Sequence, residues 1–401
     1  MVYSSRSGDE KLPSVATSSQ RVARDQVIDV IRGLCILSMV LSHTARDSPL
    51  DTYLHLAWVD GASGFFLMSG LVLGIVQRRT VDARGVATGQ RRTIRRIGVL
   101  YATQMMLVAA AIVVAPLRVN DFRIWPDVRA YSGWPDFLWH AATLQVNPKD
   151  LDVLPAYIAI FVLLLIALPA LTRYGAKPVL LGSLALYVAS TPFEQLTTPW
   201  RGDASAKLAQ FNWGCWQLLF ISAFVVGWYW QDKNIGALLL RKRIVMMAGV
   251  ALVVIYAVAT GVSHLGRPGE FLIDNLFEYK RNNPPGRVVL AWLAFIVLYG
   301  AFTWLARRGR LALLRRESAT LGRWSLNAYV ILCLSVSVSA LIPGYAGPNW
   351  RAMTLAVAVC LTALSWAHLR DGRAAAARKR HESARASDSL EARVPTPDPL
   401  P

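Results

Sequence analysis

Long apolar stretches, separated by short polar connections, fill most of this chain from residue 27 onward. Lipid offers the backbone no hydrogen-bond partners, so stretches that cross a membrane must form helices. The pattern therefore predicts an all-α polytopic membrane protein with about ten transmembrane helices, at 27–46, 56–77, 97–116, 152–171, 176–192, 213–231, 244–263, 288–306, 324–342 and 351–369. The fifth segment is short and bracketed by Pro178 and Pro192, so it either spans the bilayer or is re-entrant.

The composition supports this class. Of 401 residues, 54% are hydrophobic and only 17% are charged. A single soluble domain does not need so many uninterrupted apolar runs, whereas a polytopic membrane protein does. The formal net charge of +18 raises the possibility of nucleic-acid binding. The basic residues, however, gather in alternate connections, above all 78–96, 307–323 and the segment after 370. This alternation follows the positive-inside rule, so we expect both termini in the cytoplasm and no nucleic-acid partner.

Three parts follow from the pattern: a polar cytoplasmic N-terminal segment (1–23), one membrane domain (24–370) and a tail (371–401). The tail is rich in Ala and Arg and then in Ser and Pro, so we expect it to be disordered and cytoplasmic. The cysteines lie in predicted spans without a CxxC pair, so we expect neither a disulfide nor a metal site; they are Cys35, Cys215, Cys333 and Cys360.

Two ionisable residues, Arg32 and His43, lie inside the first apolar stretch, VIDVIRGLCILSMVLSH. Eleven residues make almost three helical turns, so both side chains leave the helix on nearly the same face, roughly 16 Å apart along its axis. Charged groups at such depth are costly, which makes them candidates for function. The distribution of basic residues puts Arg32 in the inner half and His43 near the outer end.

This arrangement suggests a reaction that spans the membrane. Histidine is the usual general base at neutral pH, and arginine binds phosphate or carboxylate groups with parallel hydrogen bonds. Asp29 lies one turn before Arg32, where it can orient the guanidinium group. The alternative is structural: Asp29 and Arg32 form an ion pair at the inner rim, and His43 caps a helix.

The arginine, ten residues and histidine of IDVIRGLCILSMVLSH resemble the signature of the acyltransferase-3 family of integral membrane acyltransferases. The segment GASGFFLMSGLVLG is similar to that family's Phe-Phe-x-x-Ser-Gly motif. Four later strings resemble the OpgC branch, which is associated with succinylation of periplasmic glucans; they are LDVLPAYI (151–158), FNWGCWQLLF (211–220), FEYKRNNPPGR (277–287) and LGRWSLNAYV (321–330).

The resemblance implies a multi-pass protein of a bacterial inner membrane that takes an acyl group from cytoplasmic acyl-CoA. The donor would be succinyl-CoA, the acceptor an envelope glycan, and membrane lipids the surroundings, with no metal. Residue by residue, it gives His43 the role of catalytic base and Arg32 that of donor contact, and it puts Ser69 at the substrate pocket. Leu71 follows Gly70 where the wider family often has an aromatic residue, so we expect a different pocket shape.

Further polar residues have two readings each. Asp152 either orients His43 or caps the helix that follows it. Lys280 and Arg287 could bind an acidic acceptor or a succinyl carboxylate. The alternative is that they are ordinary interfacial charges. Asn212 either lines a cavity or joins neighbouring helices, and the same holds for Gln217, Ser325 and Asn327. The glycines of the second segment are expected to permit close packing against the first helix; they are Gly64, Gly70 and Gly74.

Three functions compete at this point: membrane O-acyl transfer, transport of an envelope glycan or anion through the same residues, and glycan binding without chemistry. A proton-coupled transporter would be expected to bury more carboxylates in its spans. Here nearly all acidic residues lie in the connections, which favours the enzyme.

Overall fold

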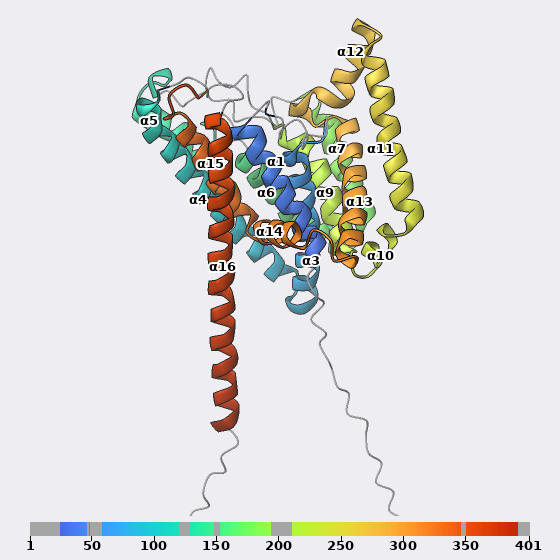
Figure 1. The fold of residues 1–401 in the computed structure, drawn as a ribbon, viewed down its shortest axis with the longest axis vertical. Coiled ribbons are helices and arrows are strands. Elements are labelled where there is room, and N and C mark those ends of the chain that lie inside the picture. The colour runs from blue at the N-terminus through green and yellow to red at the C-terminus, as the bar shows by residue number, and fades with distance from the viewer. Residues whose placement is uncertain are drawn as a thin grey trace, which may run out of the picture.

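The computed structural model describes residues 25–45, 48, 58–119, 128–147, 153–193, 211–345 and 350–391. Every element in these ranges is a helix (Figure 1). Seven helices are long and apolar enough to cross a membrane: α1 (Gln26–Thr44), α3 (Gly61–Arg84), α4 (Val86–Val114), α6 (Val153–Tyr174), α11 (Lys242–Ser263), α13 (Pro285–Arg307) and α16 (Trp350–Glu391).

The remaining predicted spans coincide with shorter helices. α7 (Ala176–Ser190) and α9 (Trp213–Trp228) are apolar but have only 15 and 16 residues. α14 (Ala312–Arg323) and α15 (Ser325–Ser339) meet at an angle of 86° and together count as an eighth candidate span. By length and composition the described chain thus has seven or eight spans. The predicted class, an all-α polytopic membrane protein, is confirmed.

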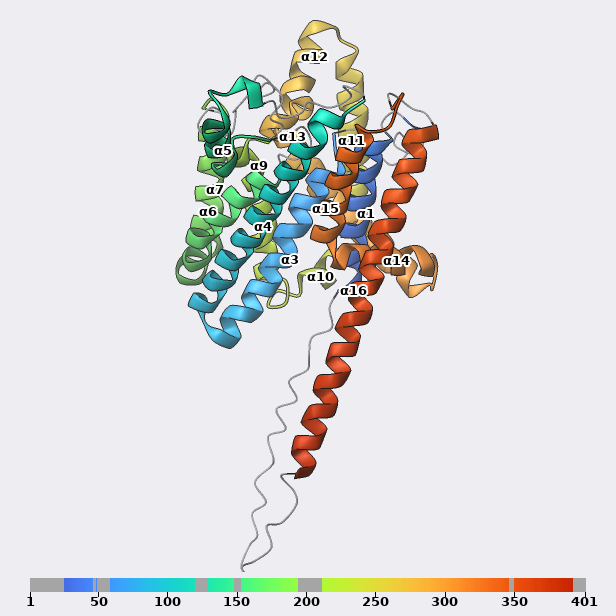
Figure 2. The same cartoon turned by 90° about the vertical axis from the view of Figure 1, so that its left-hand side faces the viewer.

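The start of α1 and the end of α16 lie at the same end of the bundle, and α14 lies across it (Figures 1 and 2). We call this end the inner face, following the distribution of basic residues. The opposite, outer face carries the short helices α5 (Trp134–Ala142) and α12 (Arg267–Ile273). The other short elements are α10 (Ile235–Leu239), η1 (Ala115–Leu117), η2 (Val128–Ala130), η4 (Asp274–Glu278) and η5 (Lys280–Asn282).

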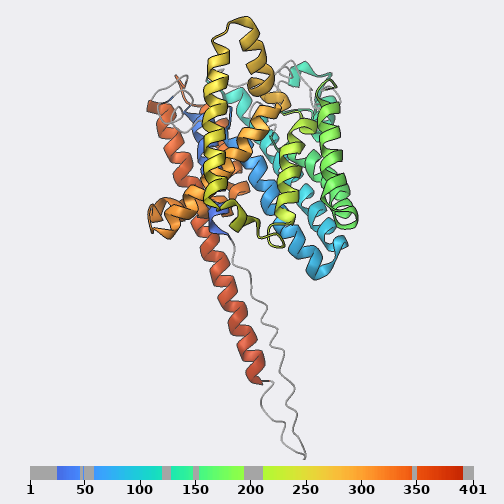
Figure 3. The same ribbon diagram turned by 90° about the vertical axis from the view of Figure 1, so that its right-hand side faces the viewer.

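The exterior of the bundle is apolar, as lipid requires. α11 lies along the outside against α13 (Figure 3). Its outward side chains include Met247 and Val253, which are 70% and 67% exposed. In water such a surface would favour aggregation, whereas in a bilayer it contacts acyl chains of similar polarity.

α16 differs from the sequence prediction beyond the membrane domain. The helix continues without a break to Glu391, through residues expected to be disordered from 371 onward. The segment after Gly372 consists largely of Ala, Arg, Lys and Glu, which are strong helix formers. Asp371 also fixes this part of α16, because it accepts hydrogen bonds from Arg323 at 2.8 Å and from the Trp324 indole at 2.9 Å.

The glycines of α3 correct another expectation. A Cβ at Gly64 would contact Cys35 of α1, as predicted. At Gly70 and Gly74, however, a Cβ would collide with backbone carbonyl groups of α9, not of α1. α3 is therefore a central helix that lies against α1 at its outer end and against α9 along its middle. The sequence could not distinguish these partners, because a glycine permits close packing without specifying the neighbour.

α14 packs tightly against the inner half of α1 through two reciprocal glycines. A Cβ at Gly33 of α1 would collide with the Ser318 carbonyl, and a Cβ at Gly322 of α14 would collide with the Asp29 carbonyl. This close approach brings the turn between α14 and α15 against Arg32. Gly322 belongs to the LGRWSLNAYV string, whose first half therefore has a packing role.

Replacing Gly322 by alanine is expected to separate α1 from α14 and to destabilise the protein by about 1–3 kcal/mol. Thermal unfolding of the detergent-purified variant would measure this loss. The matched control is Gly98→Ala, since a Cβ at Gly98 meets nothing within 4 Å in the middle of α4. That change should be neutral or slightly stabilising because alanine favours the helix. Equal unfolding temperatures for both variants would contradict the packing account.

Candidate functional site

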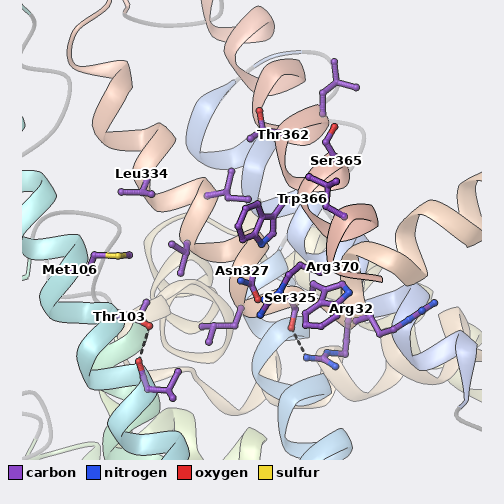
Figure 4. A pocket seen from close by; sticks show the side chains of 18 of the residues that line it. Arg32, Thr103, Met106, Ser325, Asn327, Leu334, Thr362, Ser365, Trp366 and Arg370 are labelled. Atoms are coloured by element: carbon purple, nitrogen blue, oxygen red, sulfur yellow. Dashed lines mark hydrogen bonds between the residues drawn. The ribbon is translucent and has the colours of Figure 1, made fainter. Parts of the chain in front are cut away.

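Arg32 lies in the inner half of α1 with a side chain that is only 12% exposed. Its Nη2 donates a hydrogen bond to the Ser325 hydroxyl at 2.5 Å (Figure 4). Its Nη1 lies 3.8 Å from Asp29 Oδ1, one turn earlier on the same helix. Arg32 is thus held from two helices, α1 and α15, with its guanidinium group near the centre of the bundle's inner half.

The bend between α14 and α15 forms one wall of this site. Trp324 stands at the bend, where its indole is fixed by Asp371 and covered by the guanidinium of Arg370 at 5.1 Å. Ser325 follows as the first residue of α15 and points to Arg32. The sequence predicts that Ser325 either joins helices or lines a cavity, and in the structure it does both.

A large lateral cavity of about 1070 Å³ opens between α4, α15 and α16 beside Arg32 (Figure 4). Its lining includes four arginines, Arg32, Arg96, Arg323 and Arg370, and no acidic residue from the described part of the chain. Neutral polar groups complete the lining; they include Thr103, Asn327, Thr362 and Ser365. Arg32 and Arg323 also pair with Asp29 and Asp371, so the remaining excess of positive charge makes the cavity suited to an anion.

A second, narrower cavity of about 290 Å³ continues from the same residues toward the outer half, and we call it the channel. It shares Arg32, Arg96 and Ser325 with the lateral cavity. Along α3 its lining runs from Gln77 to Phe65, twelve residues or about 18 Å of helix. Its shape and its basic inner end suit a long, thin molecule with an anionic head.

Aromatic side chains close the outer end of the channel. Tyr157 of α6 packs against Phe65 and Phe66 of α3, with ring centroids 5.7 Å and 4.4 Å apart. Tyr329 of α15 stacks against Phe65 at 6.3 Å. Ser69 lies one turn further in on the same wall of the channel. The outer end is thus apolar but carries the hydroxyl groups of three side chains.

The channel brings together motif strings that are far apart in sequence. Arg32, Ser69, Tyr157 and Ser325 come from four of the strings quoted above, and all four line this one space. Arg32, Ser69 and Ser325 were predicted from the sequence, and Arg92 and Arg96 belong to the basic connection 78–96 noted there, whereas Tyr157 was missed. Tyr157 stands in the LDVLPAYI string, yet nothing in that string tells which of its side chains faces inward.

His43 lies at the outer end of α1, where it is partly buried. It does not line the lateral cavity or the channel. Between the channel and His43, Ile36, Met39 and Val40 are buried and packed. The helix end is fixed by Tyr345, whose hydroxyl donates to the Thr44 carbonyl. Most of residues 46–57, which follow His43, and the predicted partner Asp152 lie outside the described residues.

Lys280 and Arg287 meet at one carboxylate on the outer side. Lys280 Nζ lies 2.7 Å and Arg287 Nη2 3.3 Å from Asp60 Oδ2. Asp60 also caps α3 by accepting from the backbone and side chain of Ser63, both at 2.8 Å. Burial alone would raise the pKa of Asp60, but the two cations hold it well below its usual range. Asp60 was missed from the sequence although it lies inside the predicted segment 56–77.

Asn212 has a structural role that the geometry makes clear. It caps α9 by accepting from the Cys215 backbone at 3.3 Å. Its amide group donates to the Ser190 carbonyl and to Asn282 Oδ1, both at 3.0 Å. Trp216 of the same helix donates to the carbonyls of Lys280 and Arg281 at 3.1 Å. The FNWGCWQLLF string therefore anchors the loop that carries Lys280.

Within the described ranges, no group of three or more His, Cys, Asp or Glu side chains lies close enough together to hold a metal ion. In the described part of the chain no disulfide joins any of the four cysteines.

A comparison with protein families places the membrane domain. A family model described as "OpgC protein" matches residues 24–370, which is most of the chain. No curated protein and no solved structure matches significantly. The match contains every residue that lines the lateral cavity and the channel, and also the outer ion pairs of Asp60 with Lys280 and Arg287.

Proposed function

Because this chain belongs to the OpgC family, a family of membrane transferases, we propose that it transfers an acyl group across a bacterial inner membrane. The donor is a cytoplasmic acyl-CoA, with succinyl as the acyl group. The acceptor is a hydroxyl group of a periplasmic glucan or another envelope glycan. The likeness of the Arg32 and His43 spacing to the acyltransferase-3 signature supports this reaction class.

The four-arginine lining of the lateral cavity carries the proposal. CoA has a nucleotide with several phosphate oxygens, and arginine binds such groups with parallel, charge-assisted hydrogen bonds. Arg96, Arg323 and Arg370 lie toward the inner face, and Arg32 lies where the lateral cavity meets the channel. The phosphates would occupy the lateral cavity, and the pantetheine arm would extend along the channel.

The chemistry then requires a base on the other side of the thioester. His43 takes the proton of the acceptor hydroxyl while the hydroxyl oxygen forms a bond to the acyl carbon. The carbon–sulfur bond breaks, and CoA leaves as a thiolate that takes up a proton from water at the inner face. His43 releases its proton to water at the outer face. The packed side chains of Ile36, Met39 and Val40 must shift for acyl carbon and acceptor to meet.

The size of the channel speaks against transport. A space of about 290 Å³ holds an acyl-pantetheine arm but not a glycan chain. Packed apolar side chains beyond it also separate the inner and outer compartments. The acceptor therefore approaches from outside and only the acyl group crosses.

Binding of CoA without an acyl group tests the donor site directly. We expect CoA at 100 times its Kd to stabilise the detergent-purified protein by about 2.7 kcal/mol, seen as a higher unfolding temperature. Pantetheine, which lacks the nucleotide, should stabilise it far less. If pantetheine stabilised the protein as much as CoA did, the arginine-lined cavity would not be the nucleotide site.

A further inference from the structure

Tyr157 has a buried polar group that the packing of the protein does not use. The residue is 4% exposed, four residues from the start of α6. Its hydroxyl group has no hydrogen-bond partner among the described residues. Ser69 lines the same channel but does not reach hydrogen-bonding geometry with this hydroxyl group. Leaving a buried hydroxyl group without a partner costs about 1–3 kcal/mol, so a phenylalanine would pack here at lower cost.

The surroundings hold the ring of Tyr157 firmly. It contacts Phe65, Phe66, Phe161 and Phe220, with centroid distances between 4.4 and 6.4 Å. These four rings come from α3, α6 and α9, so the hydroxyl group cannot turn away without disturbing three helices. A fixed donor without a partner is preorganised for a group that arrives with a ligand.

The direction of the channel indicates which group that is. Arg32, Arg96 and Tyr157 line the same channel, so the Tyr157 side chain borders the space that the basic, donor side opens into. Phe65, which packs on Tyr157, marks the end of the channel that lies furthest from the inner face. A donor bound with its phosphates at the arginines would bring its reactive end, the thioester, to this position.

We propose that the Tyr157 hydroxyl donates a hydrogen bond to the carbonyl oxygen of the donor thioester, in the channel between Arg32 and Phe65. When the acceptor oxygen adds to the acyl carbon, the carbonyl oxygen becomes negatively charged, and this hydrogen bond strengthens. The oxygen's electron pair then re-forms the carbonyl double bond as the carbon–sulfur bond breaks, the charge leaves with the CoA thiolate, and Tyr157 keeps its proton throughout. The inference rests on the proposed acyl transfer and assigns Tyr157 as a catalytic residue of it.

Tyr157→Phe removes only the hydroxyl group and tests the proposal. In a purified assay with acyl-CoA and a glucan acceptor, we expect kcat to fall by about 10²–10³. The KM for acyl-CoA and the CoA-induced rise in unfolding temperature should stay unchanged, because the phosphates are bound elsewhere. The matched control is Tyr101→Phe on α4, which removes a hydroxyl group that donates to the Ala142 carbonyl of α5 and does not line the channel.

The outcomes distinguish the role of Tyr157 from the proposed acyl transfer itself. If wild-type protein transfers acyl groups and Tyr157→Phe keeps its kcat, Tyr157 is not the hydrogen-bond donor, and the proposed function stands. A lower unfolding temperature with unchanged kcat per folded molecule would show a structural role and overturn the proposal. If wild-type protein transfers nothing from acyl-CoA, both proposals fall.

Discussion

Replacing His43 by alanine is expected to abolish acyl transfer. Loss of a general base costs about 10²–10⁴ in rate. The protein should still insert and fold, because His43 lies at a helix end that Tyr345 fixes through the backbone of Thr44. Mass spectra of periplasmic glycans from deletion, complemented and variant cells would measure the effect.

The control for this change is His140→Ala. His140 is also an outer histidine, but it lies on α5 beside Asp136, at 3.2 Å, and away from α1. Its replacement should leave glycan acylation at the wild-type level. Normal acylation in His43→Ala cells would show that the base is another group.

Replacing Arg32 by alanine should impair use of the donor. A hydrogen bond to a charged group contributes about 1.5–3 kcal/mol, so the KM for acyl-CoA should rise roughly 10- to 100-fold. Arg32→Lys keeps the charge but not the parallel hydrogen bonds, and we expect an intermediate value. Initial rates against acyl-CoA concentration, with purified protein, would give these values.

The ion pair with Asp29 complicates this test, and a double variant resolves it. Arg32→Ala leaves the buried Asp29 carboxylate without that cation, which lowers stability. Asp29→Asn combined with Arg32→Ala removes both charges, so stability should recover while the KM stays high. Arg95→Ala is the surface control, since Arg95 is exposed and lines neither cavity. An unchanged KM in the double variant would contradict the role of Arg32 as donor contact.

The class of fold could be predicted from sequence because lipid leaves few choices. Apolar stretches of this length must be helices, and every predicted segment coincides with one. The lengths of α7 and α9 could not be predicted, since turns at their ends depend on contacts such as that of Asn212 with Asn282. The same limit explains Gly70 and Gly74, where the sequence showed a need for close packing but not the helix that fills it.

The sequence predicts some residues of the candidate site and not others, and the difference has a physical cause. Arg32 and His43 stand out because charge in an apolar helix is costly. Tyr157 does not, because an aromatic residue in a span is common. Asp60 was missed although it lies inside the predicted segment 56–77, and in the structure the helix begins only at Gly61. Their roles become visible only through long-range contacts. Tyr157 lines a channel formed by five helices, and Asp60 pairs with Lys280 and Arg287, which are more than two hundred residues away in the sequence.

The central claim is that the acyl group passes from a donor at the inner face to an acceptor at the outer face. Sealed vesicles with the inner face outward, loaded with glucan and given succinyl-CoA only outside, test it most directly. The account predicts that the enclosed glucan gains the mass and the negative charge of succinyl groups, and that His43→Ala vesicles show no gain. Unmodified glucan in wild-type vesicles, with acylation only when CoA and glucan share one compartment, would contradict it.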